Sequence, residues 1–219
     1  MNKKVSKEKK AAKANTFVEV ATQEFLAKGI DAVRMTDIAS ACDLGVATLY
    51  RYFSVKKTIV IASGIAIWEK KVQEFQEIDD QNINEKKSGI DSITALMNHF
   101  FTVYLEEPNF FVFLRQFDNF CLAKRIKATE LVPYEKTILM IKDIFLACVK
   151  RGIEDKTVRE DLDFSVVYFS FSKAVIGLCQ KLIGENAILA SDVSVDASKQ
   201  VRTLLQVLID CFRRKNDNL

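Results

Sequence analysis

The chain has 219 residues, of which 49% are apolar, and carries a formal net charge of +3 with seven glycines and two prolines. This length and apolar share suffice for one large core or two small ones. A β-rich chain would need turn residues about every 8 to 12 positions, so their scarcity favours an all-α fold. We find no uncharged apolar run of about 18 residues and no signal-peptide pattern, and therefore expect a soluble, cytoplasmic protein with no membrane partner.

Basic residues are concentrated at the N-terminal end. Residues 1–60 have a charge balance of +5, from eleven Lys/Arg and six Asp/Glu, whereas the rest of the chain has a balance of −2. A polyanion would dock at the positive end. Six lysines precede the first predicted helix or lie on its opening turns, where they could form a flexible arm that follows a DNA backbone or a plain solubilising tail. They are Lys3, Lys4, Lys7, Lys9, Lys10 and Lys13.

Apolar spacing and turn residues predict about nine helices. The first spans about 8–28, where Phe17, Ala21 and Phe25 share a face, and ends in a cap at Gly29. A fourth helix, capped by Ser54, begins near 56 and ends near 78, before a polar stretch over 79–88. The other helices are predicted near 36–42, 46–52, 89–106, 109–126, 131–151, 163–184 and 195–214, with Pro108 and the segment around Pro133 as separators.

The second and third predicted helices are joined by a three-residue turn, Asp43-Leu44-Gly45, in which Asp and Gly tolerate left-handed backbone. Three short helices with such a turn are typical of a helix-turn-helix, whose last helix lies in the major groove of DNA. We expect the contact between these two helices to be made by Ile38, Ala39, Leu44 and Leu49. The residues left to face outward are Val46, Ala47, Thr48, Tyr50 and Arg51.

Two strings in this segment, MTDIASAC over residues 35–42 and GVATLYRYF over 45–53, are followed by Lys56. Together they resemble the N-terminal domain of the TetR/AcrR family, in which an Ile-Ala pair precedes the turn and a Leu-Tyr-x-x-Phe string closes the recognition helix. The resemblance covers residues 17–64. Two departures are the turn, where Cys42-Asp43-Leu44 replaces the frequent Ala-Gly-Val, and Arg34, which stands where a Thr commonly begins the second helix.

The resemblance implies a sequence-specific transcriptional regulator: a repressor released from a palindromic operator on double-stranded DNA by a small apolar or aromatic effector. It divides the chain into a helix-turn-helix domain over 1–55, a connecting fourth helix over about 56–78, and a ligand-binding and dimerisation domain over 79–219. Val46, Ala47 and Thr48 would approach base edges, while Tyr50, Tyr52 and Lys56 would grip phosphates. Arg34 and Thr36 complete the implied DNA-binding set. Tyr50 and Tyr52 could instead form a half-buried aromatic pair.

Aromatic residues gather between residues 96 and 120. Aromatic residues at this spacing usually belong to the hydrophobic core. The resemblance instead favours a cavity for the effector, lined by some of these aromatic side chains. The predicted ligand-binding residues are Trp68, Phe101, Tyr104, Phe110, Phe113, Phe117 and Tyr134.

The last two predicted helices are apolar over much of their surface. A helix that is apolar all round must be covered on two sides, and a second subunit would provide one cover, as in a homodimer. The predicted interface residues are Phe169, Ile176, Val201, Leu205, Leu208 and Phe212. The same stripe in a monomeric core is the alternative.

Other classes of function have little support in the sequence. With His99 as the only histidine and five scattered cysteines, which suit buried thiols, we expect no metal and no cofactor. A nucleophile with a partner base and a glycine-rich phosphate loop are both missing, so we do not expect an enzyme. An architectural or adaptor DNA-binding protein of the same fold, with no small-molecule effector, is the alternative function.

Overall fold

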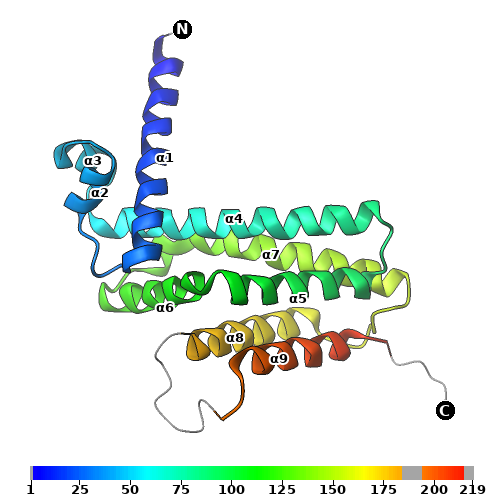
Figure 1. Cartoon of the computed structure of the whole chain (residues 1–219). Coiled ribbons are helices and arrows are strands. Elements are labelled where there is room, and N and C mark those ends of the chain that lie inside the picture. The colour runs from blue at the N-terminus through cyan, green and yellow to red at the C-terminus, as the bar shows by residue number, and fades with distance from the viewer. Residues whose placement is uncertain (1, 184–193, 215–219) are drawn as a thin grey trace, which may run out of the picture. The chain divides into compact units, whose positions relative to one another are not determined.

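The computed structural model describes residues 2–183 and 194–214 (Figure 1). Their secondary structure is helical, apart from an isolated antiparallel bridge between Val158 and Arg213. This confirms the all-α prediction. The helices are α1 (Asn2–Lys28), α2 (Met35–Ala41), α3 (Val46–Tyr52), α4 (Lys56–Asn84), α5 (Gly89–Glu106), α6 (Pro108–Ala123), α7 (Ala128–Glu154), α8 (Phe164–Leu182) and α9 (Ala197–Phe212).

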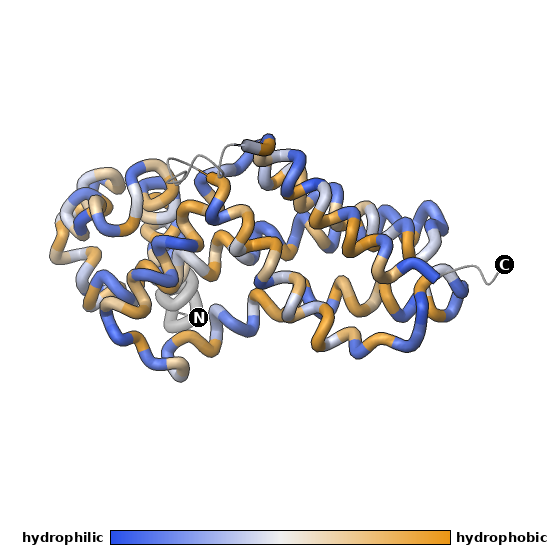
Figure 2. The backbone as a smooth tube through the Cα atoms, turned by 90° about the horizontal axis from the view of Figure 1, so that it is seen from below, coloured by the Kyte–Doolittle hydropathy of each residue, from blue (hydrophilic) through white to orange (hydrophobic). Residues whose placement is uncertain are grey.

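The helices form two compact units, one of residues 1–70 and 112–137, the other of residues 71–111 and 138–219. Polar and apolar residues alternate along the tube in Figure 2, as expected of helices that each bury one stripe. No described helix is long and apolar enough to cross a membrane. The predicted boundaries at 55 and 79 stay a prediction.

The first unit contains α1 to α3, the first half of α4, most of α6 and the start of α7. Phe17, Ala21 and Phe25 are almost fully buried, which confirms the predicted core face of α1. The chain leaves α1 at Gly29, which adopts a φ of 88° and donates its N–H to the Phe25 carbonyl oxygen at 2.9 Å. Glycine is the residue that takes this left-handed conformation at no steric cost, so the predicted cap is confirmed.

The lysine-rich segment is part of α1, which begins at Asn2 rather than near residue 8. The predicted start of the first helix near residue 8 was therefore too late, and a helical backbone does not fit the flexible arm, one of the two interpretations left open. Lys, Glu and Ala are good helix formers, and no glycine or proline interrupts residues 2–28.

The fourth helix continues to Asn84, beyond its predicted end at 78. Two polar residues of the expected break are instead buried: Asp79 forms an ion pair with Arg151 and accepts a hydrogen bond from the Cys148 thiol at 3.1 Å, and Asn82 is 2% exposed. A polar residue inside a helix need not end it when partners satisfy it, as Arg151 and Cys148 do for Asp79. The helix stops where Lys86 adopts a φ of 54°.

Pro133 lies inside α7 instead of preceding it. A proline this near the N-terminus removes one intrahelical hydrogen bond, and the helix is already started by the Glu130 carboxylate, which accepts the Lys127 N–H at 3.2 Å. The fourth helix starts at Lys56, as predicted, but Val55 and not Ser54 immediately precedes it, and the Val55 carbonyl oxygen accepts the Thr58 hydroxyl at 2.7 Å.

The second unit has its core between the second half of α4, α5, most of α7, α8 and α9, and α9 packs on both α5 and α8. Two glycines allow a close contact between α5 and α7: a Cβ atom at Gly89 would lie 2.1 Å from the Cα atom of Gly152. Cys148 and Cys179 are buried as predicted, but Cys211 is exposed because it lies on the outer side of α9.

Candidate nucleic-acid interface

The helix-turn-helix is held together by three almost fully buried side chains, Ile38 and Ala39 on α2 and Leu49 on α3. Leu44 is half-buried in the turn, and its N–H donates to the Ala39 carbonyl oxygen at 2.9 Å. Asp43 adopts a φ of 52°, so this aspartate takes the left-handed position that the sequence assigned to the turn. Gly45 has extended backbone and directly precedes α3.

The outward face of α3 presents Val46, Ala47, Tyr50 and Arg51 to solvent, while Thr48 is half-buried. The Arg51 guanidinium donates a hydrogen bond from Nη2 to the Thr48 hydroxyl oxygen at 3.2 Å. This face combines methyl groups, a phenol, a hydroxyl and a cation, which are groups that can read base edges and hold phosphates.

The two tyrosines of this segment differ in their surroundings. Tyr50 is 47% exposed, whereas the ring of Tyr52 is half-buried and packs against Phe17, with ring centroids 5.5 Å apart. They do not form the aromatic pair that was the alternative interpretation, because Tyr52 packs on α1 instead.

Three further predicted DNA-binding residues lie at the starts of helices. Arg34 and Thr36 are exposed at the start of α2, and the Arg34 N–H donates to the Asp37 carboxylate at 2.8 Å. Lys56 is half-buried at the start of α4, and burial lowers the pKa of its ammonium from its ordinary value. Roles in DNA binding for these residues are proposals.

Two contacts that the sequence did not predict anchor the helix-turn-helix segment within the first unit. The Gln116 side chain, on α6, accepts the Ile30 N–H at 2.8 Å, and a Cβ atom at Gly29 would lie 3.0 Å from the amide of Gln116. Lys57 forms an ion pair with Glu130 of α7. No sequence signal pairs residues 86 positions apart.

The predicted ligand-binding residues of the first unit are in contact with one another. The indole N–H of Trp68 donates to the Tyr134 hydroxyl oxygen at 2.9 Å, and the Tyr134 ring stacks on Phe117 with centroids 4.4 Å apart. Phe113 and Phe117 lie 5.9 Å apart, and a Cβ atom at Gly64 would lie 2.9 Å from the Tyr134 ring. Burial raises the pKa of the Tyr134 phenol. These contacts hold α4 against α6 and α7.

The other three predicted ligand-binding residues, Phe101, Tyr104 and Phe110, belong to the second unit and are buried. Phe101 stacks on Tyr104 at 6.3 Å, and the Arg202 guanidinium lies 4.1 Å from the Phe101 centroid.

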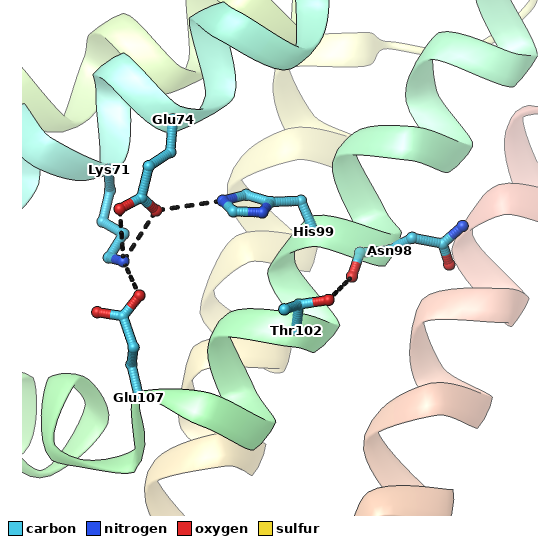
Figure 3. A network of polar contacts seen from close by, with 6 residues as sticks. All are labelled: Lys71, Glu74, Asn98, His99, Thr102 and Glu107. Carbon is cyan, nitrogen blue, oxygen red and sulfur yellow. Dashed lines mark hydrogen bonds and ion pairs between the residues drawn. The ribbon is translucent and has the colours of Figure 1, made fainter.

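A polar network lies beside these rings in the second unit (Figure 3). Lys71 is 2% exposed and forms ion pairs with Glu74 at 2.9 Å and with Glu107, and its Nζ lies 5.7 Å from the Phe110 centroid. His99 contacts Glu74 at 3.2 Å. Within the described residues, no group of three His, Cys, Asp or Glu side chains could hold a metal ion.

Four of the predicted dimer-interface residues on α9 are buried in the chain's own core: Val201, Leu205, Leu208 and Phe212. Because a side chain already covered by its own chain has no surface to offer, we revise the predicted interface. Ile176 is half-buried, and Phe169 is 39% exposed. The large exposed apolar residues on the outer sides of α8 and α9 are Val166, Phe169 and Val207.

The arrangement of described helices, with a helix-turn-helix followed by a larger helical part, defines the fold of a DNA-binding transcriptional regulator. Residues 17–62 match the family model for bacterial regulatory proteins of the TetR family. A search of curated proteins finds no match to the sequence.

Several solved structures, among them TetR-family transcriptional regulators, resemble this chain over most of its length. One from Mesorhizobium loti is 13% identical, with a TM-score of 0.71 over 94% of this chain and 98% of its own. The repressor FadR of Thermus thermophilus, solved with lauroyl-CoA, is 12% identical, with a TM-score of 0.65 over 94% and 98%. RolR, solved with resorcinol, is 13% identical, with a TM-score of 0.60 over 94% and 89%. Residues 17–62 therefore match the N-terminal segment of TetR-family regulators, and the described helices have the fold of the solved structures of that family.

Proposed function

We propose that this protein is a transcriptional repressor that binds a palindromic operator as a homodimer and is released by a small apolar or aromatic effector. The observation that carries the DNA-binding part is the exposed surface of α3, where Val46, Ala47, Tyr50 and Arg51 are exposed, with Ala47 and Arg51 on the side opposite the buried Leu49. A short helix anchored on one side and free on the other can enter the major groove.

Homodimerisation is proposed through the outer sides of α8 and α9. Val166 and Val207 are each 59% exposed, and Phe169 lies on the same helix as Val166. Apolar side chains this exposed, on two neighbouring helices, favour cover by a second copy of the chain. Twofold symmetry of the protein would then be mirrored in a palindromic operator.

The effector part of the proposal is supported by the two aromatic clusters and by the compounds held by FadR and RolR, lauroyl-CoA and resorcinol. A ligand that separates the rings around Trp68 and Tyr134 would displace α4, which begins at Lys56 beside the helix-turn-helix. To act as a switch, the ligand must prefer the DNA-incompatible state by about 1 to 3 kcal/mol, and DNA must weaken the ligand by the same factor.

Selection of bound sequences from a random DNA pool tests DNA recognition. We expect a palindrome whose half-site centres lie about 34 to 36 Å apart, and affinity that falls steeply with salt. Recovery of no palindrome, or an affinity unchanged between low and physiological salt, would contradict the proposal.

Titration of the protein–operator complex with acyl-CoA thioesters and with phenols tests release. Emission of Trp68, the only tryptophan, reports binding near α4. Phe117→Ala should weaken a releasing compound while leaving operator affinity nearly intact. Selective operator binding that no compound of either class changes would instead support the adaptor function.

A further inference from the structure

Arg51 stands at the centre of the exposed face of α3. Successive residues of an α-helix are turned by about 100°, so positions 47 and 51, each two residues from Leu49, point nearly opposite to it. Leu49 is fully buried, and Ala47 and Arg51 are exposed. The guanidinium therefore lies on the side of α3 that faces directly away from the core, where the proposed function places the DNA.

The direction of the Arg51 side chain is fixed by its bond to Thr48, at 3.2 Å between Nη2 and the hydroxyl oxygen. Long side chains on a helix lean toward its N-terminus, and this bond holds the guanidinium over the first turn of α3. In a helix-turn-helix the first turn of the recognition helix is the part that contacts base edges. Ala47, whose side chain is a single methyl group, occupies the same side and leaves room for the guanidinium.

A guanidinium in this place has a preferred partner in the major groove. Its planar fork of N–H donors matches O6 and N7 of guanine, the commonest specific contact of arginine with DNA. Arginine has five N–H donors, so one bond to Thr48 leaves others for a base. A lysine at this position would offer a compact point charge without the fork geometry.

We propose that Arg51 determines specificity by recognising a guanine in each operator half-site, and that Thr48 is a positioning residue that orients the guanidinium. The inference rests on the proposed function, because it presumes that α3 enters the major groove. Thr48 then acts through Arg51 instead of reading a base edge of its own.

Affinity is measured by fluorescence anisotropy on the operator selected by the wild-type protein and on every single base-pair variant of it. Arg51→Ala should lower affinity by roughly 5- to 150-fold for each half-site contact, so that the two losses multiply on the full operator, and it should abolish the preference at one G·C pair of each half-site. Arg51→Lys should not restore that preference. Thr48→Val should relax the preference at the same base pair, and Thr48→Ser, which keeps the hydroxyl, should retain it.

Lys56→Ala is the matched control, because loss of a phosphate contact should weaken all sequences alike and reduce the salt slope by about one for each protomer. Both Arg51 and Thr48 lie at or near the surface, and thermal unfolding of each variant checks that the fold is intact. If Arg51→Ala lowered the affinity for all operator variants equally and Arg51→Lys restored it, Arg51 would contact a phosphate and not a base. That result would overturn the inference. If Thr48→Val reduced the base preference at a different base pair from Arg51→Ala, Thr48 would not be the residue that positions Arg51.

Failure of this inference can be told apart from failure of the proposed function. A wild-type consensus that Arg51→Ala leaves unchanged in sequence and affinity would overturn the inference alone. A wild-type protein that selects no consensus would overturn the proposed function and the inference with it.

Discussion

Gln116 offers a direct test of how the helix-turn-helix is anchored. Its side-chain oxygen accepts the Ile30 N–H at 2.8 Å, in the loop that joins α1 to α2. Ile30 is 1% exposed, so its N–H lies in a part of the chain that water does not reach readily. Gln116→Leu keeps a side chain of similar volume and removes the acceptor. A buried donor that loses its acceptor costs about 1 to 3 kcal/mol.

The size of this effect makes it measurable. Domains are stable by about 5 to 15 kcal/mol, so the substitution removes a large share of the free energy of unfolding. Leucine regains little apolar burial, since Gln116 is half-buried. The control is Gln73→Leu, at an exposed position on α4 whose amide bonds only across one helical turn, to Glu77 at 2.8 Å. We expect the control to change stability by less than about 0.5 kcal/mol.

The assay is urea unfolding followed by Trp68 fluorescence at one fixed protein concentration, because the proposed dimerisation would make apparent stability depend on concentration. In Gln116→Leu, the urea concentration at which half of the protein is unfolded should be well below that of Gln73→Leu. Operator affinity should fall with it, since the loop that it anchors leads into α2. Equal midpoints for the two variants would show that the Ile30 N–H does not depend on Gln116, and the anchoring argument would then be wrong.

Two further outcomes are expected from other parts of the chain. Gly89→Ala should cost several kcal/mol in thermal unfolding, because its Cβ atom would lie 2.1 Å from the backbone of Gly152. A melting temperature equal to that of the wild type would contradict the close helix contact. Val207→Glu should dissociate the dimer in sedimentation with little loss of stability, whereas Leu205→Ala should cost about 2 to 5 kcal/mol through the core of the chain. A dimer that survives Val207→Glu would place the interface elsewhere.

The sequence predicted the local features well where a residue type has one strong physical preference. The all-helical class followed from the scarcity of glycine and proline, and the family resemblance rested on a short string around α2 and α3. Gly29 and Asp43 adopt the left-handed backbone that the turn chemistry of the sequence required. Phe17, Ala21 and Phe25 repeat at the spacing of one helix face and are buried together.

Predictions went wrong where a local signal was outweighed by a distant partner. The polar stretch after residue 78 was expected to end a helix, but Asp79 is satisfied by Arg151, 72 positions away, and α4 continues. Pro133 was expected to separate helices and lies inside α7. In both cases local sequence preference is weaker than the packing and pairing that the folded chain supplies.

The sequence by itself determined that this chain is helical, that it carries a helix-turn-helix, and which side of each helix is apolar. Tertiary structure alone decided what covers those apolar sides: the stripe of Leu205 and Leu208 packs into the chain's own core and leaves Val207 outside. The tertiary structure also shows that the Gln116 side chain accepts a hydrogen bond from the Ile30 N–H and that the Arg51 guanidinium donates one to the Thr48 hydroxyl. The physical reason is that periodicity fixes the direction of a side chain relative to its own helix axis, whereas its partner depends on how helices distant in sequence are packed.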